Sequence, residues 1–220
     1  MPPQPQADPQ TPIPDHAQTE ALLEVQPCCN GPRVWLGREV SRLVGKPATR
    51  DKPAELRADK LLGVWLRCLV LSAFDAEPAM RPNHHAVVVA RDATLWVMPL
   101  PPAEARDTLD RLLGVWLQSM QAPLPLPPKT ALKWLADRGD GHVTRECYEG
   151  GYQQTGEGED PFWQRMYPDF EALTACGRFE TLADTVYAPL QHWVNTCIQV
   201  VPHPPLDVPD RVTPAEGALA

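Results

Sequence analysis

The sequence predicts an α/β fold, and three observations support this. Two stretches, Ala54–Phe74 and Ala103–Gln121, carry apolar residues at the three- and four-residue spacing of an amphipathic helix. The runs His85–Ala90 and Thr94–Met98, which lie between them, are short and apolar, and the first is rich in β-branched side chains, as strands are. Helices and strands therefore alternate along a chain of 220 residues, a length typical of one domain.

Proline marks the expected ends of that domain. The chain holds 27 prolines, more than twice the average usage of about 5%. They are dense in Met1–Thr19 and in Val201–Ala220, which contain too few apolar residues to offset the entropy lost on ordering. We therefore expect a disordered Pro/Gln-rich segment (1–20), one folded domain (21–200) and a disordered tail (201–220).

The first part of the expected domain begins with strands. Ala21–Pro27 and Val34–Leu36 flank the turn dipeptide Asn30-Gly31, which favours a hairpin. Whether the second strand extends through residues 40–44 stays open. A polar loop, Gly45–Pro53, then precedes the first helix, and the runs at His85 and Thr94 predict a second hairpin with its turn at residues 91–93.

The second part is mainly helical. Pro101-Pro102 precedes the helix Ala103–Gln121, and proline is favoured in the first turn of a helix. The proline-rich stretch that follows is expected to be extended, because proline fixes φ and restricts its predecessor. Three further helices are expected at Lys129–Arg138, Pro161–Tyr167 and Arg178–Ile198, and Pro189 is expected to kink or divide the last of them.

The hexapeptide LLGVWL occurs at Leu61–Leu66 and again at Leu112–Leu117. The residues that flank the two copies differ, and no other similarity recurs at this separation. A repeat array needs about three units to bury its stacking faces. We therefore interpret the two copies as independent helices that contribute to one core.

The chain carries a net charge of −8, which argues against a protein that coats DNA over its whole surface. One segment is nevertheless basic: residues 31–67 hold nine Lys or Arg and four Asp or Glu. Arg38 and Arg42 share strand parity and would line one face of a strand. These charges either contact phosphates or are ordinary solvated side chains, and both interpretations stay open. The candidate nucleic-acid-binding residues are Arg38, Arg42, Lys46, Arg50 and Lys52, with Arg33 beside them.

No metal or cofactor is predicted in this chain. The six cysteines form no Cys-x-x-Cys pair and are interpreted as reduced thiols. A zinc site from Cys28-Cys29 and His84-His85 would need a special turn, because adjacent residues in extended backbone point to opposite sides. The chain also lacks the glycine-rich phosphate loop of P-loop ATPases.

A basic segment in an α/β chain raises the possibility of a metal-dependent nuclease of the PD-(D/E)XK type. Such enzymes need a carboxylate on one strand and a Glu/Asp-x-Lys on the next. Val40 lies where the first carboxylate would be and cannot bind metal, and Glu39 would face the other side of the strand. Glu55-Leu56-Arg57 has the outline of the second motif, but arginine does not give up a proton at neutral pH. We therefore predict no catalytic residue in this chain.

The acidic residues Glu157, Glu159 and Asp160 invite a similar question. They would be able to hold a divalent cation, or they belong to a glycine-rich turn that ends in an Asp N-cap before Pro161. The Asp-Pro pair is a common helix-start signal and favours the turn.

Several segments, in order, resemble the C-terminal domain of RecC, the gamma subunit of exodeoxyribonuclease V. The match extends over about residues 21–195, and its most specific parts follow the second copy of LLGVWL. The segments are CNGPRVWLGREV, ADKLLGVWLRCLVLSA, PLPPAEARDTLDRLLGVWLQSMQAPLPLPPKTALKWL, YEGGYQQTGEGEDPFWQRMYPDFEAL and FETLADTVYAPLQHWV.

The resemblance implies a degenerate PD-(D/E)XK restriction-endonuclease-like core with added helices, which has lost its nuclease residues. It also implies a non-catalytic subunit, or a C-terminal fragment, of the RecBCD helicase/nuclease of double-strand-break repair and homologous recombination. Its partners would be RecB, RecD and DNA, both duplex ends and single strands, and Mg²⁺ and ATP would belong to the partner subunits. The related AddB-type subunits hold an iron–sulfur cluster with clustered cysteines, which this sequence lacks.

Two alternatives to this function stay open. A complete RecC is several times longer than this chain, so the chain is alternatively the nonfunctional remnant of a split RecC gene. The second alternative is that the chain is an active Mg²⁺-dependent DNA nuclease module. No signal peptide and no apolar run of membrane-spanning length is present, so we expect a cytoplasmic protein that does not contact membranes.

Overall fold

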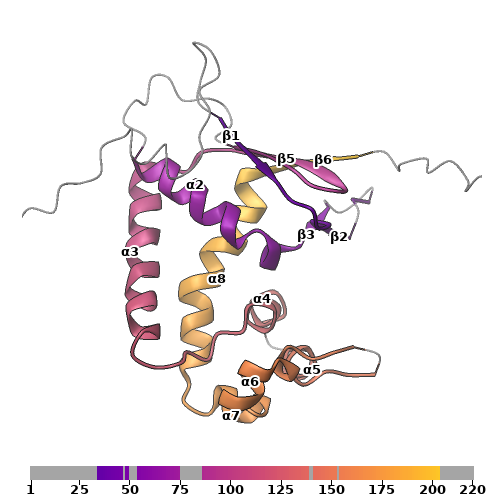
Figure 1. The fold of residues 1–220 in the computed structure, drawn as a ribbon, viewed down its shortest axis with the longest axis vertical. Helices are drawn as coiled ribbons and strands as arrows, with labels where there is room; N and C mark the ends of the chain where they lie inside the picture. The colour runs from indigo at the N-terminus through magenta and orange to yellow at the C-terminus, as the bar shows by residue number, and fades with distance from the viewer. Residues whose placement is uncertain are drawn as a thin grey trace, which may run out of the picture.

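The computed structural model describes residues 34–46, 48–49, 54–74, 86–138, 141–152 and 154–203 (Figure 1). A small mixed sheet lies along one edge of the molecule, and the long helices lie on one side of it (Figure 1). The mixed α/β class is therefore confirmed, whereas the finer expectation of a PD-(D/E)XK-like core stays a prediction.

The sheet has four strands in the order β1-β4-β5-β6. Strand β1 is parallel to β4, and the pairs β4–β5 and β5–β6 are antiparallel. Alternate side chains of the central strands are buried against the helices, as expected for a sheet covered on one face. The strands are β1 (Trp35–Arg38), β4 (Ala86–Val89), β5 (Ala93–Val97) and β6 (Ile198–Pro202).

The hairpin predicted around residues 91–93 is confirmed. Val89 pairs with Thr94, and the two strands run antiparallel on either side of the turn. The hairpin predicted from Ala21–Pro27 lies outside the described residues, and the described neighbour of β1 is β4. Strand β1 ends at Arg38 and does not extend through residues 40–44. Instead, Ser41 forms a bend, and a separate short strand, β2 (Val44–Lys46), follows.

The first long helix begins later than predicted. Helix α2 spans Leu62–Phe74, and the residues from Ala54 form a short strand, β3 (Glu55–Leu56), and the 3₁₀ turn η1 (Ala58–Lys60). Strand β3 pairs antiparallel with β2, and the N–H of Arg57 donates to the carbonyl of Leu43 at 2.8 Å. This long-range pairing replaces the first two turns of the expected helix, because it satisfies the same main-chain groups.

The other expected helices are present. Proline occupies the first turn of α3, α4 and α6, where its missing N–H costs nothing. Helix α8 continues through Pro189 without division, and β6 follows it directly and runs to Pro202, beyond residue 200. Sequence reasoning did not foresee α5 (Gly141–Glu149), η3 (Glu157–Glu159) or α7 (Phe170–Thr174). The confirmed helices are α3 (Pro102–Ser119), α4 (Pro128–Ala136), α6 (Pro161–Met166) and α8 (Arg178–Cys197).

The two LLGVWL copies lie in different environments. In the first copy Leu61 and Trp65 are buried, with 0% and 1% of their surfaces exposed. In the second copy Trp116 and Leu117 are 56% and 57% exposed, and Val115 is the residue that turns into the core. The expectation that both copies contribute their apolar face to one core is therefore wrong for most of the second copy. None of the helices in the described part of the chain is both long and apolar enough to cross a membrane.

The two tryptophans of the repeated hexapeptide offer a matched test of this packing. We expect Trp65→Ala to lower the free energy of unfolding by about 3–5 kcal/mol, because it leaves a large cavity in the core. Trp116→Ala should change it by no more than about 0.5 kcal/mol, as is usual at exposed positions. Urea denaturation followed by circular dichroism measures both, and similar losses in the two variants would contradict the burial described here.

Candidate nucleic-acid interface

The structure describes three of the five predicted basic residues. Arg38, Arg42 and Lys46 are all exposed, and they lie along the chain from the end of β1 to the end of β2. Arg50 and Lys52, as well as Arg33, lie outside the described residues. Because β1 ends at Arg38, Arg38 and Arg42 do not line one face of a single strand, and that part of the expectation is wrong.

Arg38 belongs to the side of the sheet that faces away from the helices. It pairs with Val89 of β4, which pairs in turn with Thr94 of β5. The neighbouring row crosses the same three strands from Leu36 to Trp96. Three of these side chains are well exposed, since Leu36 keeps 67%, Val89 40% and Trp96 37% of their surfaces. We call this surface the outer sheet face, and it comprises Leu36, Arg38, Val87, Val89, Thr94 and Trp96.

Arg42 lies beside a carboxylate that the sequence did not single out. Asp92, in the β4–β5 turn, accepts hydrogen bonds from the main-chain N–H groups of Leu43 and Val44, both at 3.0 Å. These bonds fasten the segment that carries Arg42 to the end of the β-hairpin. Aspartate is a common turn residue that binds main-chain N–H groups, but its partners here lie 48 and 49 positions away in the chain. No local signal in the sequence gives that pairing.

The Asp92 carboxyl has a lowered pKa as a result. Burial by itself would raise the pKa, but the hydrogen bonds from the main chain and the nearby positive charge of Arg42 outweigh it. The charged form of Asp92 is therefore the form that holds this corner of the molecule together.

Lys46, like Arg42, lies beside a carboxylate of its own domain. Its ammonium lies 2.8 Å from the carboxylate of Glu55, across the β2–β3 pair. Both side chains are largely exposed, so the pair contributes little to stability. The Glu55 carboxylate nevertheless lowers the positive potential that Lys46 would offer to a phosphate.

The carboxylates near the expected nuclease positions are occupied by contacts within the chain. Val40 is 89% exposed and offers no ligand. The Glu39 carboxylate accepts from the Ser41 N–H at 3.1 Å and from its hydroxyl at 2.9 Å, and these bonds lower its pKa. Glu55 pairs with Lys46. Within the described ranges, no group of three or more His, Cys, Asp or Glu residues is placed to hold a metal ion.

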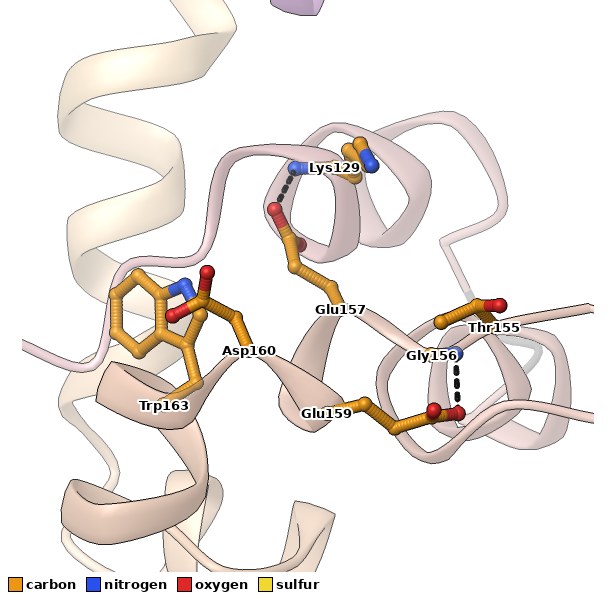
Figure 2. A pocket seen from close by; sticks show the side chains of 7 residues that line it. All are labelled: Lys129, Thr155, Gly156, Glu157, Glu159, Asp160 and Trp163. Atoms are coloured by element: carbon orange, nitrogen blue, oxygen red, sulfur yellow. Dashed lines mark hydrogen bonds between the residues drawn. The ribbon is translucent and has the colours of Figure 1, made fainter.

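The acidic turn before α6 lines an open depression of about 430 Å³ (Figure 2). Glu157 caps the start of α4, where it accepts from the N–H of Lys129 at 3.1 Å and from the N–H and hydroxyl of Thr130 at 2.7 and 2.9 Å. Asp160 accepts from the Phe162 N–H at 2.9 Å, which confirms the predicted N-cap. The lining residues are Lys129, Thr155, Gly156, Glu157, Glu159, Asp160 and Trp163.

Glycine is required at the centre of this turn. A side chain at Gly156 would place its Cβ 2.3 Å from the carbonyl oxygen of Tyr148, and the N–H of Gly156 donates to Glu159 at 2.9 Å. Figure 2 shows Glu157 directed toward α4 and Glu159 directed back toward Gly156. The turn interpretation is therefore confirmed, because each of the three carboxylates caps main-chain N–H groups.

The described cysteines, Cys68, Cys147, Cys176 and Cys197, are free thiols. Burial raises the pKa of Cys68 to about 12, which keeps it protonated and unreactive at neutral pH. The hypothetical zinc ligands Cys28-Cys29 and His84-His85 lie outside the described residues.

One comparison with known proteins identifies a family. The family model described as the RecC C-terminal domain matches residues 7–139, which is more than half of the chain. The matched range includes the outer sheet face, the β2–β3 pair and helices α2 to α4. The comparison with curated proteins found no match.

The two hydrogen bonds from Leu43 and Val44 to the Asp92 carboxylate, which we call the Asp92 clamp, predict a stability that depends on pH. A carboxyl whose pKa is lowered in the folded state stabilises that state above its unfolded pKa of about 3.9, and this stabilisation is lost as the pH falls through the folded pKa. We therefore expect Asp92→Asn to be less stable than the wild type at pH 6–7, and the difference to shrink below about pH 4. Thermal unfolding at a series of pH values measures this, and a difference that grows on acidification would show that the charged carboxylate is not the stabilising form.

Proposed function

The chain belongs to the RecC C-terminal domain family, and we propose that it acts as a non-catalytic part of a RecBCD-type complex in DNA repair, where it scaffolds RecD and handles DNA strands. The family match is the observation that carries this proposal, because it includes the first half of the domain, with the outer sheet face and helix α3. RecB and RecD are the proposed partners, and they would supply the sites for ATP and Mg²⁺.

The contacts of the carboxylates support a non-catalytic role. Glu39 and Glu55 are the carboxylates nearest the expected nuclease motifs in the sequence, and these two and Asp92 are each engaged by a group of their own domain. To bind Mg²⁺ they would have to exchange these contacts for metal coordination, and the exchange would loosen the β2 segment. No contact in the described part favours the rival function of an active nuclease.

The outer sheet face is the proposed contact for a single DNA strand. An arginine at its edge can contact phosphates, and exposed aromatic and apolar side chains beside it can stack against bases. Arg38 and Trp96 provide this combination on adjacent rows of the sheet, with one strand, β4, between them. Arg42 follows Arg38 along the chain, and the Asp92 clamp fixes its position. Arg50 and Lys52 extend the proposed basic segment in sequence.

Assembly with the partner subunits tests the proposed function. We expect the full chain, co-expressed with RecB and RecD of the same organism, to co-purify with them as one species in size-exclusion chromatography. The Trp65→Ala variant serves as a control for folding, since its core is disrupted and it should be excluded from the complex. A wild-type chain that elutes alone would indicate a nonfunctional remnant instead.

Binding of a single DNA strand tests the outer sheet face. We expect Arg38→Ala and Arg42→Ala each to weaken binding of a labelled oligonucleotide several-fold, and to reduce the slope of log K against log salt by roughly 0.7 per phosphate contact. Lys46→Ala is the matched control, because its charge is already paired with Glu55 and its removal should change affinity little. Fluorescence anisotropy at low salt measures all three, and equal losses in the three variants would contradict a specific role for the arginines.

A further inference from the structure

Helix α3 carries a row of exposed apolar side chains that the fold does not use. Leu113, Trp116, Leu117 and Met120 follow one another at the i, i+3, i+4 and i+7 positions of one helix face. Their exposed fractions are 55%, 56%, 57% and 69%. Figure 1 shows α3 as the outermost of the long helices, with α2 and α8 on one side of it only. We call these four residues the α3 stripe.

The α3 stripe is distinct from the face by which α3 packs into its own domain. Ala105, Thr108 and Val115 are the buried residues of the helix, and they point toward α2 and α8. At 100° per residue, the centre of the stripe lies roughly a third of a turn away from the mean direction of these three residues. Four large apolar side chains in one exposed row are unusual on a free monomer and mark interaction surfaces.

The chemistry of the stripe favours a protein partner. Residues 112–121 carry no charged side chain, so this half of the helix offers nothing to a phosphate backbone. Apolar anchors at i, i+3, i+4 and i+7 are the pattern by which a helix binds the apolar face of another helix. The exposed tryptophan at the centre is the residue type most often found to dominate such interfaces.

Charge distinguishes between a second copy of this chain and a different partner. The chain carries −8, so two copies repel each other. On α3 itself, Asp107 and Asp110 precede the stripe by one to two turns, and within the described ranges neither carboxylate has an ion-pair partner. The arginines of the helix are directed to other groups, since Arg106 donates to the Ala73 carbonyl and Arg111 to the Asp107 carbonyl and the Thr108 hydroxyl.

We propose that the α3 stripe is the docking site for a basic amphipathic helix of a partner subunit, whose apolar face covers Leu113, Trp116, Leu117 and Met120 and whose basic flank meets Asp110. This assignment rests on the proposed function, because it requires that the chain work as a subunit. It places partner binding on the helical side of the domain, away from the outer sheet face.

The test uses two designed peptides as probes for the docking surface of the full chain. Both are amphipathic helices of about 18 residues, long enough to fold, with the same leucine face. One carries lysines and the other glutamates on the remaining positions. We expect fluorescence anisotropy to show binding of the lysine peptide and at least about tenfold weaker binding of the glutamate peptide, because the Asp110 carboxylate attracts lysine and repels glutamate.

Variants locate the binding surface. Leu113→Gln/Leu117→Gln should weaken binding of the lysine peptide by about tenfold or more, because it removes two central anchors. Leu66→Gln is the matched control, since Leu66 ends the first LLGVWL copy as Leu117 ends the second and is also exposed, at 44%. Its effect should stay within about twofold. Asp110→Lys should reduce the preference for the lysine peptide. Unchanged affinity in the double-leucine variant, with folding verified by circular dichroism, overturns the proposal.

Two further measurements separate this inference from the function on which it rests. If the wild type joins RecB and RecD and the double-leucine variant joins them equally well, the docking site is wrong and the proposed function stands. If the wild type does not join them but binds the lysine peptide through the stripe, the function is wrong and the surface stands. If light scattering shows that the wild type is a dimer and the double-leucine variant a monomer, the stripe binds a second copy of this chain. The proposal of a basic partner helix is then wrong.

Discussion

The burial of helix α8 is the constraint on which the rest of this domain depends. Nine of its side chains are buried, among them Phe179, Leu190 and Trp193, and it packs against α3, α4 and α7. The chain then passes from α8 directly into β6, which pairs with β5 along five residues. One continuous segment therefore joins the helical layer to the sheet, and a change that moves α8 moves the strand that forms one edge of the sheet. The continuity of α8 through Pro189 follows from the same burial, because packing on several sides outweighs the loss of one main-chain hydrogen bond.

This arrangement explains why the two LLGVWL copies differ. Helix α2 and helix α8 both lie on the same side of α3, so α3 has one narrow face to bury and keeps its other faces in solvent. Val115 enters the core and Trp116, its neighbour, cannot, because adjacent residues on a helix point about 100° apart. In the first copy Leu61, Val64 and Trp65 are buried in the core, and of its large apolar side chains Leu66 is the one left exposed. Local sequence predicts that both segments are helices, but only the surrounding packing decides which side each helix buries.

The same distinction separates what the sequence predicts from what it does not. Signals that act within a few residues gave correct answers: the prolines that begin α3, α4 and α6, the Asp160 cap, and the β4–β5 hairpin with its short turn. Features that depend on distant residues were missed, as in the β2–β3 pair, which converts the expected start of α2 into a strand, and in the Asp92 clamp. In the candidate interface, the sequence indicated the basic residues but not the carboxylates beside them, Asp92 next to Arg42 and Glu55 next to Lys46. Partners of this kind are set by loop closure and burial, which no local periodicity reports.

The positions of the two proposed surfaces bear on how such a domain would work within a complex. The outer sheet face is formed by side chains of β1, β4 and β5 that point away from the helices, whereas the α3 stripe lies on the helical layer. No residue is shared between them, so a partner docked on α3 would leave the strands free to contact DNA. The connection between the layers is then useful, because α3 packs on α8, and α8 leads directly into β6, which pairs with the rest of the sheet. The contacts of Asp92 and Glu55 suit this role, since they also hold the β2 segment and Arg42 in place.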